Sequence, residues 1–248
     1  MIEATSYLQM DRISYQTPII SGALLLNNIS LNIASGEFLA FTGDDLTGKT
    51  SLLKLCAGLL EPTGGCIRIR GKQLSGFSYR ELQLFRQKIG FVLQNGVLIN
   101  NLSLKENITL PLRYHSRLSD DSINRSAEKY LELLNLTGYA NERPAELSLE
   151  TRLLTGLARA LIVEPELLLL DEIFSSLSRD NLWLVINHLK EIKAERRLTC
   201  LATTGLADLL SSFPEGQLID RLVVIESGQV IEEGATQSVR MNLLKKQG

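Results

Sequence analysis

Histidine, cysteine and tryptophan are scarce in this sequence, with two, three and one among its 248 residues. The cysteines, Cys56, Cys66 and Cys200, are odd in number and lie in apolar stretches, which favours reduced thiols in a core over a disulfide framework or a metal site. Neither sign of charge is in excess, because the chain has 26 basic and 28 acidic residues. We therefore expect no nucleic acid partner, because nucleic-acid-binding proteins usually present clustered positive charge.

Long apolar runs are also missing. A run such as Leu167 to Leu170 follows Glu164, Pro165 and Glu166, and it is far shorter than the roughly 20 apolar residues of a membrane-spanning helix. The first residues, MIEATSYLQMDR, lack the basic start and apolar centre of an export signal. We therefore expect a cytoplasmic protein.

Hydrophobic residues make up 44% of the chain, enough for one substantial core. Apolar segments with strand character alternate with segments of helical periodicity, a pattern that predicts an α/β fold with a parallel sheet covered on both faces. The predicted strands are Phe38 to Thr42, Leu167 to Leu170 and Thr199 to Thr203, and the predicted helices are Gly48 to Ala57, Leu153 to Ile162 and Asn181 to Arg196.

Other segments complete this organisation. The apolar content of Leu24 to Leu31 and Ile67 to Ile69 predicts a β-rich start, and Leu222 to Ile225 with Gln229 to Glu232 reads as a closing hairpin. Residues 96 to 149 change character and resemble an inserted helical lobe. We expect one domain over residues 1–248.

Residues Gly43 to Thr50 match the pattern GxxxxGK[ST] between a predicted strand and a predicted helix. In such a loop, backbone N–H groups and the helix N-terminus surround phosphate groups. Lys49 would neutralise phosphate charge and Thr50 would ligate magnesium; the alternative is an inert loop. The predicted nucleotide contacts are Gly43, Asp44, Asp45, Leu46, Thr47, Gly48, Lys49, Thr50 and Ser51.

Two carboxylates, Asp171 and Glu172, follow the predicted strand at Leu167 to Leu170. The carboxyl ends of strands in open α/β sheets are where ligands bind. Asp171 is therefore a candidate magnesium carboxylate, and Glu172 is placed to polarise an attacking water as a general base. The alternative is that these residues are ordinary acidic ends of a strand.

With these two motifs in order, nearly the whole chain resembles the ATP-binding cassette (ABC) ATPases. Gln94 resembles the glutamine that senses metal and water, Tyr15 the aromatic residue that stacks on adenine, and Asp220 to Ile225 the ending of transporter cassettes. The resemblance implies ATP and Mg²⁺ as cofactors, with Lys49, Gln94 and Glu172 as catalytic residues and Thr50, Gln94 and Asp171 at the metal.

The same resemblance implies a P-loop NTPase (RecA-like) core with a parallel sheet, an N-terminal antiparallel β subdomain and an inserted α-helical subdomain. The nucleotide-binding core would comprise residues 1–95 and 161–248, and the helical subdomain about 96–160. The implied partners are a membrane permease subunit and a second cassette, which places the chain at the inner face of the cell membrane. We assume a homodimer, and a heterodimer stays open.

Finer features resemble the ATPases of MCE-type (Mla-like) phospholipid transport systems. These are Gln94 to Leu98, Asn107 to Leu112, and Asp171-Glu172-Ile173-Phe174 in place of that group's Asp-Glu-Pro-Phe. Val97, Leu98 and Ile99 are then candidate permease contacts, although the core of the helical lobe explains them equally well.

The sequence also departs from the family at several positions. Leu147 to Thr151 stands where the signature Leu-Ser-Gly-Gly-Gln is usual, so that Leu149 and Glu150 replace two glycines close to phosphate. Thr204 replaces the switch histidine, and Ser178 the D-loop aspartate. We therefore expect weak ATP hydrolysis at most.

These departures leave a second class of function open, a non-hydrolysing nucleotide-binding or scaffold subunit that regulates a transporter. The carboxylate of Glu150 is expected to repel a nearby phosphate, and Asp45 and Leu46 to border the phosphate loop. A third class, the chromosome-associated cassettes, requires long coiled-coil heptads or zinc inserts, and the sequence contains neither.

Overall fold

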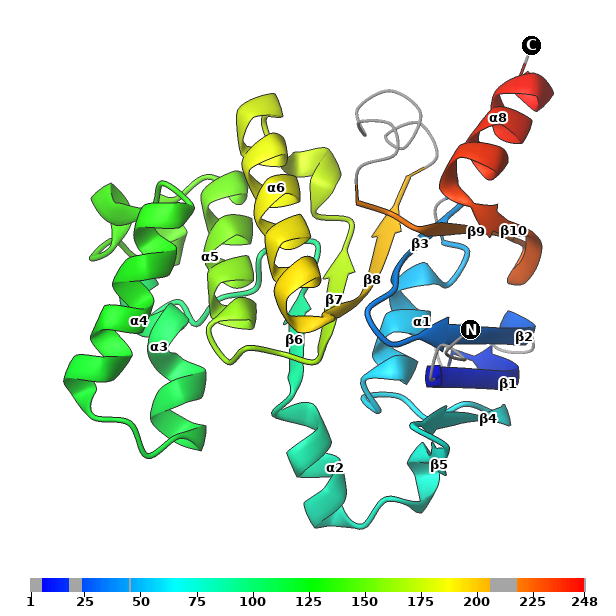
Figure 1. Ribbon diagram of the computed structural model, residues 1–248, viewed down its shortest axis with the longest axis horizontal. Coiled ribbons are helices and arrows are strands. Elements are labelled where there is room, and N and C mark those ends of the chain that lie inside the picture. The colour runs from blue at the N-terminus through cyan, green and yellow to red at the C-terminus, as the bar shows by residue number, and fades with distance from the viewer. Residues whose placement is uncertain (1–5, 18–23, 45, 206–217, 248) are drawn as a thin grey trace.

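The computed structural model describes residues 6–17, 24–44, 46–205 and 218–247 (Figure 1). A six-stranded sheet has the order β10-β9-β3-β8-β7-β6, with β6, β7, β8, β3 and β9 parallel and β10 antiparallel to β9. Its strands are β3 (Phe38–Thr42), β6 (Ile89–Val92), β7 (Leu167–Asp171), β8 (Thr199–Thr204), β9 (Arg221–Glu226) and β10 (Gln229–Ala235). The predicted parallel sheet and closing hairpin are confirmed.

A second sheet is antiparallel and has the order β2-β1-β4-β5. Its strands are β1 (Ser6–Gln16), β2 (Leu24–Ala34), β4 (Gly64–Ile69) and β5 (Lys72–Gln73). The predicted β-rich start is therefore confirmed. The sequence pattern did not delimit β1, because its alternation is broken by register shifts between Met10 and Ile13, where Arg12 has a φ of 51°.

Helices flank both sheets. The longer ones are α1 (Lys49–Cys56), α2 (Tyr79–Arg86), α3 (Leu104–His115), α4 (Asp120–Leu133), α5 (Leu149–Leu161), α6 (Arg179–Arg196) and α8 (Thr236–Gln247). Short 3₁₀ helices are η1 (Leu74–Gly76), η2 (Thr137–Tyr139), η3 (Pro144–Glu146) and η4 (Phe174–Ser176). In the described ranges, no helix is long and apolar enough to span a membrane.

The central strands β3, β7 and β8 of the six-stranded sheet are buried along their whole length, as their continuous apolar sequences predict, whereas exposed and partly buried residues alternate in the edge strand β10. In β7, Leu168 and Leu170 belong to the core shared with α5 and α6, whereas Leu167 and Leu169 belong to the core shared with α1 and the antiparallel sheet. Figure 1 shows this arrangement, with α5 and α6 on one side of the sheet and α1 on the other. This layering holds the carboxyl end of β7 at a fixed place beside the start of α1.

The helices α3 and α4 come between β6 and β7 in the chain, and α3 packs against both α4 and α5. They agree with the predicted helical lobe, although its boundaries at about residues 96 and 160 stay a prediction. Helix α5 begins at Leu149, earlier than the apolar pattern indicated, because the Ser148 side chain accepts a hydrogen bond from the Thr151 N–H and caps the helix. The three cysteines are free; Cys56 and Cys200 are buried, whereas Cys66 is only partly buried and not in the core as expected.

Candidate nucleotide site

The loop between β3 and α1 depends on glycine at both ends. Gly43 has a φ of 141°, and a Cβ there would lie 2.0 Å from the Ile225 carbonyl oxygen. Gly48 has a φ of 89° and precedes α1, where no side chain caps the helix. The first N–H groups of α1 are therefore available for an anion, which the positive end of the helix dipole also favours.

Lys49 is buried beneath this loop, with 4% of its surface exposed. Its Nζ donates hydrogen bonds of 2.8 Å to the carbonyl oxygens of both Gly43 and Asp44. The same ammonium lies 3.6 Å from Oε1 of Glu172. The positive charge is thus held at the floor of the loop, within reach of the carboxylate that follows β7.

Asp171 ends β7 and is 2% exposed. Its Oδ1 accepts hydrogen bonds from the hydroxyls of Thr50, at 2.9 Å, and Thr203, at 2.8 Å. Thr50 begins α1 beside Lys49, so the sheet and the phosphate loop meet at this carboxylate. The structure therefore joins the two motifs that the sequence separates.

Glu172 and Gln94 lie on neighbouring segments, because β7 and β6 are adjacent parallel strands. The Gln94 Nε2 donates a 2.8 Å hydrogen bond to Oε2 of Glu172. Glu172 adopts a left-handed backbone conformation with a φ of 49°, and its side chain is 20% exposed. This carboxylate is thus accessible and held between an amide and an ammonium.

A cavity of about 640 Å³ opens over these groups, a volume within the range of small-molecule sites. It is lined by Thr17, Leu25, Leu46, Thr47, Gly48, Lys49, Thr50, Ser51, Gln94 and Glu172. Eight of these, Leu46 to Ser51 with Gln94 and Glu172 beside them, come from the predicted motifs. Thr17 and Leu25 were missed, because they border the site from the antiparallel sheet and belong to no motif.

The residues present fit a divalent cation that arrives with a nucleotide. Mg²⁺ is usually held by one or two carboxylates, water and substrate phosphates, and the Thr50 hydroxyl with the Asp171 carboxylate offers such oxygens side by side. Within the described residues, no three His, Cys, Asp or Glu side chains are grouped as a metal site. The phosphates and water would therefore complete the coordination.

A family model for ABC transporters matches residues 26–175, more than half of the chain. The chain belongs to the ABC transporter family. The matched range includes the phosphate loop, Gln94, Asp171 and Glu172, so the family assignment and the cavity rest on the same residues. The ABC ATPases bind ATP, which agrees with the glycine loop and the buried Lys49 at this site.

Two curated relatives are import proteins by name. Methionine import ATP-binding protein MetN 1 of Pseudomonas putida is 32% identical over 214 residues, which cover 86% of this chain and 62% of that protein. Methionine import ATP-binding protein MetN of Brucella abortus is 34% identical over 217 residues, covering 88% and 57%. The chain thus spans about three fifths of the length of these relatives.

Solved structures of ABC cassettes share the fold. The cassette MJ0796, solved as a dimer in a post-hydrolysis state with ADP and Pi, has a TM-score of 0.84 at 26% identity, covering 92% of this chain and 98% of its own. The structure of cbiO1 from Clostridium perfringens, part of the ABC transporter complex cbiONQ, has a TM-score of 0.78 at 23% identity, with 97% and 94% covered. The predicted fold class is therefore confirmed.

One expected nucleotide contact of this ABC cassette lies elsewhere. Tyr15 is 8% exposed and packs in the core between the antiparallel sheet and α1, and it does not line the cavity. Its position in β1 is an inward-facing one, like that of Ile13, so the ring is committed to packing. The expected stacking on adenine is thus not supported. Asp45 lies outside the described residues.

Leu46 is expected from the sequence to stand where the ABC phosphate loop usually has glycine. It has a φ of 63° and is 92% exposed. A left-handed backbone costs a non-glycine residue roughly 1–2 kcal/mol, so the loop keeps the shape that glycine would allow at some expense in stability. As expected from the sequence, this bulky side chain borders the cavity.

Glu150, expected from the sequence at the second glycine of the signature, is engaged within its own chain. Its Oε1 accepts hydrogen bonds from the Ser178 N–H, at 2.6 Å, and from Nδ2 of Asn181, at 2.8 Å. Ser178 precedes α6 and makes no side-chain cap of its own, so Glu150 caps this helix from α5. We call this contact the Glu150 clamp. The negative charge of Glu150, which we expected to repel a phosphate, is therefore directed toward α6.

The Glu150 clamp makes stability depend on pH. Burial raises the pKa of Glu150, but the hydrogen bonds from Asn181 and Ser178 outweigh it, so the pKa is lowered overall. A carboxylate with a lowered folded pKa stabilises the protein above its unfolded pKa of about 4.3, and this contribution disappears as the pH falls through the folded value.

We expect Glu150→Ala to lower the free energy of unfolding by about 1 kcal/mol at pH 7, the usual value of a helix cap. Urea unfolding should show this difference shrinking at pH values below about 4. Glu146→Ala, in the neighbouring 3₁₀ helix and exposed, is the matched control and should change little. An equal loss in both variants, or a difference that persists in acid, would contradict the clamp.

Thr204, the residue expected from the sequence at the position of the switch histidine, ends β8 and is 3% exposed. Its hydroxyl donates a 3.3 Å hydrogen bond to the carbonyl oxygen of Gly205, and the residue does not line the cavity. Thr204 therefore offers no group to a phosphate in this arrangement.

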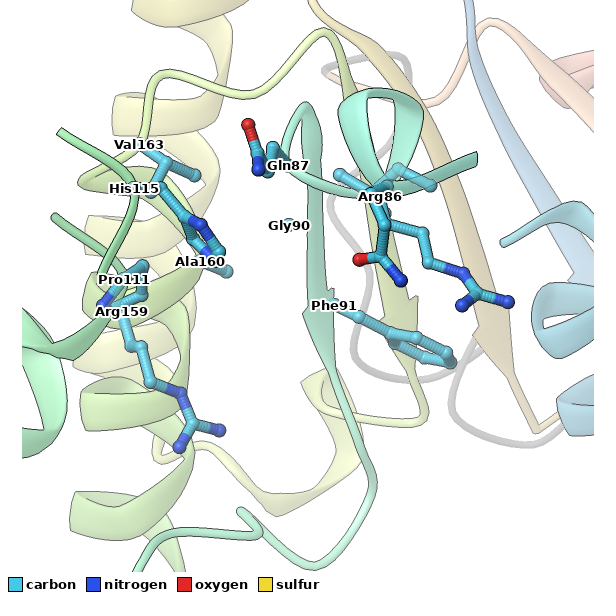
Figure 2. Close-up of a pocket in the computed structure, with 11 residues that line it drawn as sticks. Arg86, Gln87, Gly90, Phe91, Pro111, His115, Arg159, Ala160 and Val163 are labelled. Carbon is cyan, nitrogen blue, oxygen red and sulfur yellow. The ribbon is translucent and has the colours of Figure 1, made fainter. Parts of the chain in front are cut away.

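A smaller cavity of about 250 Å³ lies between α2, β6, α3 and α5 (Figure 2). Its two arginines do not converge on it: Arg86 donates to the Gly58 carbonyl oxygen, and Arg159 to that of Val97 at 2.6 Å. Figure 2 shows these side chains extending to opposite sides, with His115 between the helices. The cavity therefore lacks the convergent charge of an anion site.

Proposed function

We propose that this chain is the ATP-binding subunit of a membrane ABC transporter and hydrolyses ATP slowly. The proposal rests on one connected cluster of side chains at the cavity, in which hydrogen bonds and an ion pair join neighbours. Its members are Lys49, Thr50, Gln94, Asp171 and Glu172. Each has the functional group that phosphoryl transfer requires, namely a cation, oxygen ligands for a metal and a carboxylate base.

In the proposed reaction, the phosphates of ATP lie over the loop from Gly43 to Lys49 and the N-terminus of α1. Glu172 accepts a proton from a water whose oxygen forms a bond to the γ-phosphorus. The bond from that phosphorus to the bridging oxygen breaks, and ADP and phosphate leave. When bound, Mg²⁺ neutralises charge on the β- and γ-phosphates, and Thr50 and Asp171 would hold it.

The extent of similarity favours one transported class over the other. The relatives named for methionine import share 32–34% identity over more than 210 residues, whereas the resemblance to phospholipid systems rests on a few short segments. The names of the relatives do not support lipid transport. We therefore favour an importer of a small solute, and the proposal covers only the part of those relatives that this chain spans.

The proposed partners are a permease and a second cassette. Val97 and Ile99 are 54% and 41% exposed, and the loop that carries them is fixed by Asn107. The buried Asn107 side chain accepts from the Ile99 N–H and donates to the carbonyl oxygens of Ile99, Leu102 and Ser103. A rigid loop with two exposed apolar side chains suits a permease segment, and the chain would then lie at the inner face of the membrane.

A second candidate function is a nucleotide-binding subunit without turnover. It is favoured by Thr204, which turns away from the cavity, and by Leu149 and Glu150 in the signature segment. In a heterodimer, an intact partner cassette would compensate for part of these changes. In a homodimer, which we assume, both sites carry all of them.

Equilibrium binding of labelled ATP, with and without Mg²⁺, and phosphate release by the chain assembled with its copurified permease distinguish the two functions. We expect Mg²⁺-dependent binding with slow release of phosphate. Binding without release would support the second candidate, and no binding would refute both. The identity of the copurified permease would decide between solute import and lipid transport.

A further inference from the structure

Thr203 connects the two acidic residues of the site through one hydroxyl group. It lies in β8, paired with Asp171 of β7 across the parallel sheet, and it is 0% exposed. Its Oγ1 donates a 2.8 Å hydrogen bond to Oδ1 of Asp171 and accepts a 2.9 Å hydrogen bond from the N–H of Glu172. Thr203 precedes Thr204 in the segment that resembles the switch-histidine motif, and the sequence predicts no role for it.

The bond to Asp171 fixes the orientation of that carboxylate. Both Thr203 and Thr50 bond the same oxygen, Oδ1, from opposite elements, one in the sheet and one in α1. A carboxylate with one oxygen held at two points keeps one rotamer. Asp171 is thereby held in one orientation beside Thr50, which lines the cavity.

The bond from Glu172 fixes the backbone of the proposed base. Glu172 has a φ of 49°, a conformation that costs free energy in a non-glycine residue and persists only where its surroundings stabilise it. The Thr203 hydroxyl accepts the N–H of this residue and so stabilises the turn that directs its side chain toward Gln94 and Lys49. Without that acceptor, the N–H would be left partly buried and unpaired.

We propose that Thr203 is a positioning residue, which holds Asp171 and Glu172 in their relative geometry for Mg²⁺-ATP binding and hydrolysis. It acts through these two residues and touches no reacting atom. The inference rests on the proposed function, and it adds to that function a hydroxyl group from β8 as a required part of the site.

The test compares Thr203→Val, which keeps the shape but removes both hydrogen bonds, with Thr203→Ser, which keeps the hydroxyl. We expect Thr203→Val to lower kcat, or to raise the Mg²⁺ concentration for half-maximal activity, by about 10- to 100-fold, as is usual when a group supporting a metal ligand is lost. Thr203→Ser should stay within about 3-fold of the wild type on both measures, because its hydroxyl can make the same two bonds.

Thr199→Val is the matched control. Thr199 lies at the other end of β8, is 1% exposed and accepts one hydrogen bond from the Gly36 N–H, remote from the cavity. Thermal unfolding of all variants measures any general loss of stability. Equal losses of activity in the two valine variants, no change in Thr203→Val, or no rescue by serine would overturn the inference.

Equilibrium binding keeps the inference separate from the proposed hydrolysis. If the wild type binds ATP but releases no phosphate, hydrolysis fails as a function, and Thr203 is tested by binding alone. Thr203→Val should then raise the Mg²⁺ concentration that supports half-maximal ATP binding by about 10-fold or more, with rescue by serine. An unchanged Mg²⁺ dependence would refute the role of Thr203 even though ATP is bound.

Discussion

Glu172→Gln lowers ATP turnover of the assembled transporter by about 10²- to 10⁴-fold and leaves ATP binding close to that of the wild type, if Glu172 is the general base. This range is what one positioned base usually contributes to a reaction. The glutamine has nearly the same shape, and its amide oxygen can still accept the hydrogen bond from Nε2 of Gln94. The variant therefore changes the proton acceptor while preserving the geometry around it.

Two measurements check this expectation, steady-state phosphate release and equilibrium binding of labelled ATP. Glu164→Gln provides a matched control, because Glu164 has a φ of 51°, close to that of Glu172, and lies outside the cavity in an ion pair with Arg196. Its turnover should stay at the level of the wild type. Unchanged hydrolysis in Glu172→Gln would remove Glu172 from the mechanism.

Lys49→Met should weaken ATP binding by about 10³-fold. A unit charge about 4 Å from a phosphate oxygen contributes roughly 4 kcal/mol at an effective dielectric near 20, which corresponds to that change in affinity. Lys49 is suited to this contribution because it is 4% exposed and is held by the carbonyl oxygens of Gly43 and Asp44. Methionine is a similarly unbranched side chain, one atom shorter, and it removes the charge and the donors of Lys49.

Binding of labelled ATP in the presence of Mg²⁺ measures this effect. Lys54→Met is the control, since Lys54 lies in the last turn of the same helix and does not line the cavity. Thermal unfolding of both variants separates lost affinity from lost stability, because Lys49 also lies 3.6 Å from Glu172. Affinity within about 3-fold of the wild type would refute the assignment of Lys49 to the phosphates.

Local patterns explain why much of the site was predictable. The loop from Gly43 to Thr50 is continuous in sequence, and its glycines have the conformations that the motif requires. Asp171 and Glu172 follow an unbroken apolar strand that can only be central in a sheet. The order of parallel strands then brings Gln94 beside Glu172, so three short motifs fix one cavity.

The remainder depends on contacts between distant segments, which local patterns do not encode. The Glu150 clamp joins Glu150 to Ser178 and Asn181, which are 28 and 31 positions further along the chain. The link from Thr203 to Asp171 depends on the register of β8 against β7. Tyr15 was misassigned for a similar reason. A tyrosine in a strand has the same sequence signature whether its ring faces a ligand or a core, and only the packing of β1 decides.

The Glu150 clamp also has an optical consequence. The only tryptophan of the chain, Trp183, lies two positions after Asn181, in the first turns of α6, and it is half-buried. Indole emission responds to the polarity around the ring, so we expect the emission spectrum of an unlabelled sample to move if the first turns of α6 repack when the clamp opens. The tryptophan emission of this chain comes from this one position in α6, without interference from any other tryptophan.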